Sequence, residues 1–89
     1  MKVLEVSIYG NKYRIRSDFD EFFLEEAAKM VENRMKEIEE TYRILTTSKV
    51  AIMAAFDIAT EYLKVKRDLD FLENRLSEIE KKLEIVEGV

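Results

Sequence analysis

The chain has 89 residues, and its 19 acidic and 15 basic side chains give a net charge of −4. It contains no cysteine and no histidine, which excludes disulfides, thiol nucleophiles and nearly every zinc or iron site. The acidic balance argues against non-specific binding to nucleic acid or to an anionic membrane. A domain of this size buries only a marginal core, so association with further copies would help to stabilise it.

The N-terminal residues predict a β-hairpin. Residues 3–9 alternate, and Gly10-Asn11 supplies the positive-φ pair that a tight turn requires. The expected cross-strand pairs are Tyr9 with Lys12, Ile8 with Tyr13, Val6 with Ile15, and Glu5 with Arg16. In that register one face of the ribbon is apolar, formed by Leu4, Val6, Ile8, Tyr13 and Ile15. Two strands alone are barely stable, so the ribbon must lie on a helix or add to a partner's ribbon.

A first helix is expected to follow the hairpin. Ser17-Asp18, with Asp20-Glu21 behind it, is typical of a helix start with acidic residues in the first turn. The apolar spacing carries this helix to about Tyr42. Its expected buried stripe consists of Phe23, Ala27, Met30, Val31, Met35, Ile38 and Tyr42.

A second, much longer helix is predicted after a turn at 43–45. Thr46, Thr47 and Ser48 offer N-terminal caps, and the helix should continue to about Glu87. Roughly forty residues at 1.5 Å per residue give a rod of about 60 Å. Between Val50 and Leu63 apolar residues surround most of the helix, which predicts burial on several sides within a head shared with a second copy. The residues assigned to that head dimer interface are Ile52, Met53 and Phe56.

A heptad seam runs along the second helix. Alternating steps of three and four residues meet Ala55, Ile58, Tyr62, Val65, Leu69, Leu72, Leu76, Ile79, Leu83 and Val86. Two apolar positions per seven residues make helices wind around one another, so at least one further copy is implied. Three of the four flanking charge pairs favour a parallel dimer, whereas leucine at position a with Ile79 and Val86 at position d favours a tetramer.

These elements predict an α+β fold: an N-terminal β-hairpin, one medium helix and one long C-terminal helix that ends in a coiled-coil stalk. We expect a globular head over residues 1–63 and the stalk over residues 64–89. Paired carboxylates such as Asp18/Asp20 are better explained by a solvated helix surface than by catalysis, and no glycine-rich loop is present to hold phosphate. The sequence therefore predicts neither an enzyme nor a cofactor.

The strand with Lys12, Arg14 and Arg16 is the most concentrated basic feature, and three interpretations are open. It could be a solvated ribbon face, a nucleic-acid surface, or a docking surface for an acidic protein. Nucleic acid needs a broader basic surface than this acidic chain offers. Charge steers protein pairs without deep burial, and an oligomer would repeat a weak contact several times.

Three segments resemble the ZapA family of Z-ring-associated bacterial cell-division proteins. They are Ile8-Tyr9-Gly10-Asn11-Lys12-Tyr13, the segment 34–38 (RMKEI), and above all the segment 48–59 (SKVAIMAAFDIA). The resemblance covers nearly the whole chain, in the right order. It implies a cytoplasmic protein at the midcell division site that binds FtsZ and cross-links or bundles its filaments.

The same resemblance implies an architecture and a set of contact residues. It implies a dimer of heads that associates through stalks into an antiparallel, dumbbell-like tetramer, with Met53 at a position important for self-association. The FtsZ surface would include the hairpin turn at Asn11 and the start of the long helix at Ser48. Because both positions differ from the charged residues of some relatives, the expected contacts extend to Lys12, Arg14, Arg16 and Lys49.

Two other classes of coiled-coil protein are alternatives. A prefoldin-like chaperone or another oligomeric adaptor is the main alternative, but prefoldins place their hairpin between two helices and this hairpin precedes both. A zipper-type DNA-binding protein needs a basic helix before its seam, whereas residues 50–59 are mostly apolar.

Overall fold

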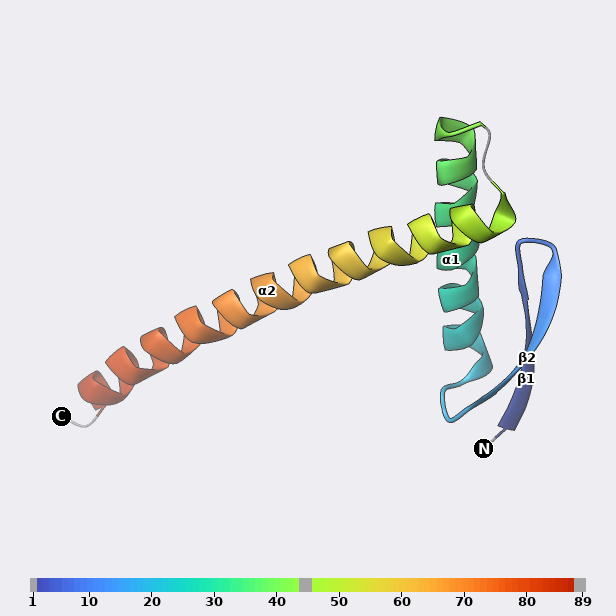
Figure 1. Cartoon of the computed structure of the whole chain (residues 1–89). Coiled ribbons are helices and arrows are strands. Elements are labelled where there is room, and N and C mark those ends of the chain that lie inside the picture. The colour runs from blue at the N-terminus through green and yellow to red at the C-terminus, as the bar shows by residue number, and fades with distance from the viewer. Residues whose placement is uncertain (1, 44–45, 88–89) are drawn as a thin grey trace. The chain divides into compact units, whose positions relative to one another are not determined.

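The computed structural model describes residues 2–43 and 46–87, with side chains as far as Leu83. Two strands, β1 (Lys2–Ile8) and β2 (Asn11–Ser17), precede two helices, α1 (Glu21–Thr41) and α2 (Thr47–Glu87) (Figure 1). The predicted α+β fold with a hairpin, a medium helix and a long helix is confirmed. The chain divides into two compact units, residues 1–58 and residues 59–89, so α2 belongs to both.

The hairpin forms, but the predicted register is wrong by two residues. Val6 lies opposite Tyr13 rather than Ile15, and Glu5 lies opposite Arg14 rather than Arg16. The turn residues are Tyr9 and Gly10, with φ of 53° and 83°, not Gly10 and Asn11. A shift by an even number of residues keeps every side chain on its predicted face, so the apolar face is retained.

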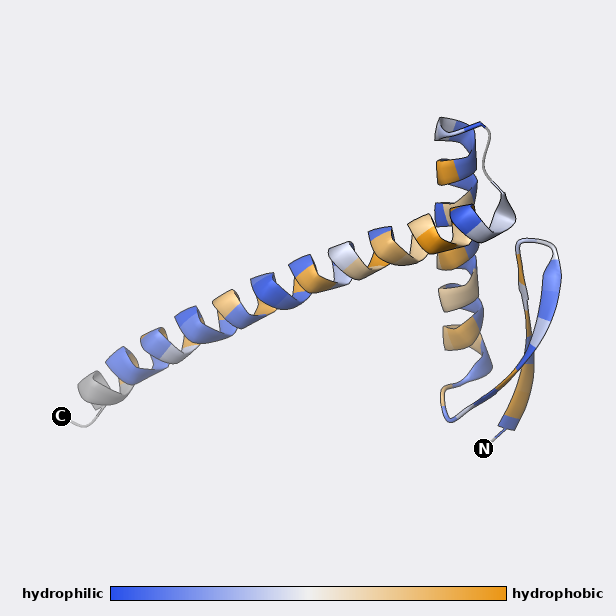
Figure 2. Ribbon diagram, viewed as in Figure 1, coloured by the Kyte–Doolittle hydropathy of each residue, from blue (hydrophilic) through white to orange (hydrophobic). Residues whose placement is uncertain are grey.

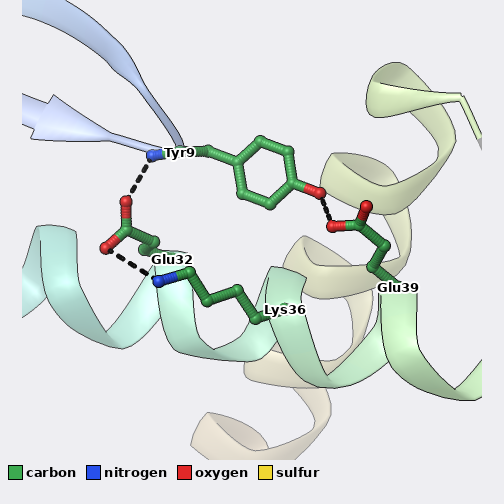
Figure 3. A network of polar contacts seen from close by, with 4 residues as sticks. All are labelled: Tyr9, Glu32, Lys36 and Glu39. Atoms are coloured by element: carbon green, nitrogen blue, oxygen red, sulfur yellow. Dashed lines mark hydrogen bonds and ion pairs between the residues drawn. The ribbon is translucent and has the colours of Figure 1, made fainter.

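Contacts with α1 explain why Tyr9 accepts a positive φ that is costly for a residue with a side chain. Its backbone N–H donates a hydrogen bond to Glu32 Oε1 at 2.8 Å, and its hydroxyl donates one to Glu39 Oε2 (Figure 3). Lys36 Nζ lies 3.8 Å from the other carboxylate oxygen of Glu32. Partners more than twenty residues away along the chain therefore fix the position of this turn. The turn preferences of the local sequence give no information about those partners.

The helix starts follow side-chain capping. Asp20 caps α1, because its Oδ1 accepts a hydrogen bond from the Phe23 N–H at 2.8 Å. Ser17 instead closes the turn after β2 by accepting from the Phe19 N–H at 3.1 Å, so α1 begins later than Ser17-Asp18 predicted. Thr46 Oγ1 accepts from the Lys49 N–H at 3.3 Å, which confirms one of the three caps offered for α2. Residues 44 and 45 of the predicted turn lie outside the described residues.

The core of residues 1–58 is small. Met35 on α1 packs with Val50 and Ala54 on α2, and partly buried side chains of Ile8, Tyr9, Val31 and Ile38 pack against this cluster. Val6 and Ala28 are the other buried apolar residues among those described, and β1 lies beside α1 (Figure 1). The hairpin tip, the middle of α1 and the first two turns of α2 therefore meet at one place.

The predicted stripe of α1 is only partly buried within one chain. Val31, Met35 and Ile38 face the core as expected, but Phe23, Ala27, Met30 and Tyr42 are exposed. The buried side of α1 instead continues through Ala28 to Leu24, one helical position away from the predicted Ala27 and Phe23. Phe23, Ala27 and Met30 lie on the neighbouring side of α1, which the described residues of a single chain do not cover, and Tyr42 lies beyond the end of the helix as its C-cap.

The beginning of α2 likewise buries a single side. Val50 and Ala54 are buried and Met53 is half-buried, whereas Ile52 and Phe56 are 68% and 72% exposed. The expected burial on several sides is therefore absent within one chain. From Ala59 to Leu83 every described residue of α2 is exposed, and apolar residues are interspersed with polar ones along this segment (Figure 2).

Shortening Val50 to alanine should destabilise residues 1–58 because the removed methyl groups come from a side chain that is 1% exposed. We expect the free energy of unfolding to fall by about 2 kcal/mol for Val50→Ala. Urea denaturation at one fixed protein concentration measures the loss. Val3→Ala, on an exposed part of β1, is the matched control and should cost well under half as much; equal losses would contradict this description of the core.

Candidate functional site

The outer face of β2 concentrates positive charge. Lys12, Arg14 and Arg16 alternate along the strand and are all exposed. Glu5 is the nearby acid: its carboxylate lies 3.8 Å from Lys12 Nζ, and its Cα is opposite that of Arg14. Both members of the ion pair are largely solvated, so it stabilises the hairpin little and leaves the strand with a positive outer face.

A groove of about 480 Å³ lies between the hairpin and the two helices within residues 1–58. Its wall from the hairpin includes Tyr13 and Ile15, and its floor includes Val31 and Met35 of α1. The complete lining is Ile8, Tyr9, Asn11, Tyr13, Arg14, Ile15, Val31, Met35, Thr47 and Ala51. This lining is mostly apolar, and Arg14 is its charged residue.

The structure brings together only some of the six residues predicted to contact FtsZ. Asn11 and Arg14 line the groove, and Lys12 and Arg16 lie on the same exposed face of β2 as Arg14. Ser48 follows the groove residue Thr47 along α2. Lys49 lies on a different side, because two residues along a helix correspond to a rotation of about 200° from both Thr47 and Ala51. The six predicted residues therefore lie on at least two separate surfaces.

Sequence reasoning missed the groove and a second apolar surface. Ala51 lines the groove with a small side chain, and although it lies in the segment 48–59, nothing in that segment indicates that this residue borders a groove. The second surface is apolar and mostly aromatic: Phe19, just before α1, and Phe22, Phe23 and Met30 on α1 are exposed. The rings of Phe19 and Phe23 stack with centroids 4.8 Å apart. The apolar spacing predicted Phe23 and Met30 as part of the buried stripe of the first helix, whereas both are exposed in the single chain.

The second unit presents the predicted coiled-coil seam as an exposed stripe. Its apolar side chains from Tyr62 to Leu83 are between 49% and 63% exposed. They are Tyr62, Val65, Leu69, Leu72, Leu76, Ile79 and Leu83, and the side chain of Val86 lies outside the described part. Apolar surface repeated over six turns of helix exceeds what a monomeric protein usually exposes, which marks the stripe as an interaction surface.

An ion pair joins α1 to α2 within the first unit. Arg34 Nη1 lies 2.8 Å from Asp57 Oδ2, and the arginine side chain is only 20% exposed. The pair lies one helical turn beyond Ala54, where it fixes the side of α2 that faces α1. This contact gives Asp57 a structural role.

The described residues contain no helix long and apolar enough to cross a membrane. They also contain no group of three or more carboxylates placed to hold a metal ion. The features that remain are a basic strand, an apolar groove and two exposed apolar helix surfaces, which together define a small protein-interaction module with a long helix available for coiled-coil pairing.

Comparison with known proteins identifies the family of this module. The family described as "Cell division protein ZapA" matches residues 4–87. The Cell division protein ZapA of Bacillus licheniformis is 32% identical over 73 residues, which are 82% of this chain and 86% of that protein. The protein of the same name from Geobacillus sp. is 34% identical over 71 residues, 80% and 82% of the two chains.

Two solved structures share this fold. The "ZapA mutant dimer from Geobacillus stearothermophilus" superposes with a TM-score of 0.73 at 32% identity, covering 85% of this chain and 88% of that one. An "Unknown conserved bacterial protein from Pseudomonas aeruginosa PAO1" gives a TM-score of 0.68 at 28% identity over the full length of both chains. The chain belongs to the ZapA family of cell division proteins.

Removing the carboxylate of Asp57 should loosen α2 from α1, because it takes away a charged partner of the half-buried Arg34. We expect Asp57→Ala to lower the free energy of unfolding by about 1 kcal/mol, and by less at high salt. Asp70→Ala, on the exposed surface of the same helix, is the control and should change it by less than about 0.5 kcal/mol. Urea denaturation of both variants at matched concentration decides, and equal effects would show that the ion pair contributes nothing.

Proposed function

We propose that this protein binds FtsZ and cross-links or bundles its filaments, so that it promotes and stabilises the Z-ring without being an enzyme. Membership of the ZapA family is the observation that carries the proposal. The protein would act in the cytoplasm at the midcell division site. The exposed apolar stripe of α2 supports the part of the proposal that needs several copies of the chain in one assembly.

Two separate contacts would build that assembly. The first is a dimer of heads (residues 1–63), with Ile52, Met53 and Phe56 in its interface. Ile52 and Phe56 are suited to this role because they lie one turn apart and are mostly exposed in the single chain. The mutant dimer of the Geobacillus stearothermophilus protein, which shares this fold, supports self-association into a dimer.

The second contact would join the stalks (residues 64–89) of two dimers into an antiparallel tetramer. The seam from Leu69 to Leu83 is exposed, and pairing would bury it. Each tetramer would carry four heads, so a weak contact between one head and one filament would become a strong link between filaments. This multivalency is the mechanism by which a small non-catalytic protein could bundle a polymer.

The filament contact is assigned to the basic outer face of β2, together with Asn11, Ser48 and Lys49. Three cations on one short strand are a local exception in a chain whose net charge is −4. Such a surface would attract an acidic partner and orient it before close contact forms. Because Lys49 lies on a different side of α2 from the groove residues Thr47 and Ala51, it would contribute to filament binding separately from Lys12 and Arg14.

Reversing the charge of the β2 face should prevent binding to filaments. FtsZ assembled with GTP is sedimented with the intact protein, with a variant carrying Lys12→Glu and Arg14→Glu, and with Lys49→Glu alone. We expect the intact protein to pellet with the polymer and thicken it, and the double variant to remain in the supernatant, with Kd raised at least about tenfold. Lys49→Glu should have a smaller, separate effect.

A variant with Lys64→Glu and Lys81→Glu controls for the change in net charge, because it alters the same charge on exposed positions of α2. It should pellet like the intact protein. If the intact protein does not pellet with FtsZ, the proposed function is wrong. If the double variant and the intact protein pellet equally, FtsZ binding stands but the β2 face does not carry it.

Charges placed in the two apolar surfaces should separate the two assembly steps. Leu76→Asp with Leu83→Asp should leave a folded dimer and abolish the tetramer, because pairing would bury the new carboxylates. Phe56→Glu, at a side chain that is 72% exposed in the chain, should dissociate the heads without unfolding them. Light scattering measures the masses, with circular dichroism to confirm folding. A tetramer that survives the double leucine change contradicts the stalk assignment, and an unchanged mass for Phe56→Glu contradicts the head interface.

A further inference from the structure

The free edge of β2 is available for an additional strand. Within the described residues the sheet has only β1 and β2, so each strand has one unpaired edge. The two-residue turn at Tyr9-Gly10 makes Ile8 and Asn11 a hydrogen-bonded pair, and such pairs alternate with non-hydrogen-bonded ones along the ladder. The backbone N–H and C=O groups of Lys12, Arg14 and Arg16 therefore face away from β1, toward the free edge.

The same strand forms one wall of the apolar groove. Side chains alternate along β2, so Tyr13 and Ile15 lie on the face opposite the three cations, beside Ala51 of α2 and Met35 of α1. Tyr13 remains 49% exposed even though it faces the groove. The groove volume of about 480 Å³ is sufficient for several apolar side chains next to these residues.

We propose that an extended segment of a partner protein, with alternating acidic and apolar residues, adds to the free edge of β2. Its backbone would pair with that of Lys12, Arg14 and Arg16, as in other cases of strand addition to a sheet edge. Its acidic side chains would lie beside the three cations, and its apolar side chains would enter the groove. The inference rests on the proposed function in taking FtsZ as the partner, and it specifies the chemistry of the segment that docks.

Charge distinguishes this occupant from a second copy of the chain. Pairing β2 with β2 of another copy would place Lys12, Arg14 and Arg16 beside one another, and like charges across strands are destabilising. Pairing with β1 of another copy would offer only Glu5 as an acid, because Val3 and Ser7 share its face. A segment with two or more acidic residues on one face matches the three cations better than either strand of this chain.

Two pairs of variants test the groove and the edge separately. Ala51→Trp fills the groove from an exposed position, and Glu40→Trp puts the same side chain on α1 away from it. Arg14→Pro removes both the guanidinium and the N–H that faces the free edge while sparing the ladder to β1, whereas Arg14→Thr removes the guanidinium alone. Circular dichroism and light scattering first establish that each variant keeps its fold and mass.

Binding is measured by sedimentation with FtsZ assembled in GTP. We expect Ala51→Trp to weaken binding at least about tenfold and Glu40→Trp to leave it unchanged, with Arg14→Pro clearly weaker than Arg14→Thr. If Ala51→Trp binds as well as the intact protein, the inference is overturned and the proposed function stands. If Ala51→Trp instead reduces the mass of the assembly, the groove holds a second copy and the inference is likewise overturned.

A direct probe separates this inference from FtsZ itself. The ¹⁵N-labelled intact protein is titrated with a synthetic ten-residue peptide that alternates glutamate and valine, and with the same peptide carrying lysine for glutamate. Shifts of the amide signals of Tyr13, Arg14 and Ala51 with the acidic peptide alone support the site, even if FtsZ does not pellet the protein and the proposed function fails. Unshifted signals, or equal shifts with both peptides, overturn it.

Discussion

The packing of Met35 against Val50 and Ala54 is the interaction on which the first 58 residues depend. It joins the middle of α1 to the first turns of α2, and Ile8 and Tyr9 pack on it from the hairpin. The small side chain of Ala54 allows α1 and α2 to approach closely, and the ion pair between Arg34 and Asp57 continues the contact one turn further along α2. Without this cluster, neither the groove nor the position of β2 would be defined.

The same cluster is small compared with the apolar surface that the chain leaves uncovered. Phe22, Ile52 and Phe56 are each more than two-thirds exposed, and the seam of α2 adds a long apolar stripe. A chain that folds around so few buried residues is only marginally stable by itself. Association therefore has two consequences here: it would stabilise the fold, and it would multiply the surfaces available for a partner.

Tyr9 connects the fold to the candidate docking surface. Its hydrogen bonds to Glu32 and Glu39 hold the turn one residue earlier than local preferences predict (Figure 3). The resulting pairing leaves the backbones of Lys12, Arg14 and Arg16 unpaired at the edge of β2. In the register expected from Gly10-Asn11, Tyr9 would pair with Lys12, and the groups facing the free edge would be those of Tyr13 and Ile15 instead. A tertiary contact therefore decides which residues can receive another strand.

The sequence alone determined the order of the elements, the faces of the hairpin, the group of three possible caps that includes Thr46, and the apolar seam of α2. Each of these depends on local spacing: a period of two for strands, seven for the seam, and a capping side chain within three residues. Only the tertiary structure decided the register of the hairpin, the side of α1 that is buried and the groove beside Ala51. These depend on residues distant in sequence, such as Tyr9 with Glu32, and on how closely small side chains allow two elements to approach.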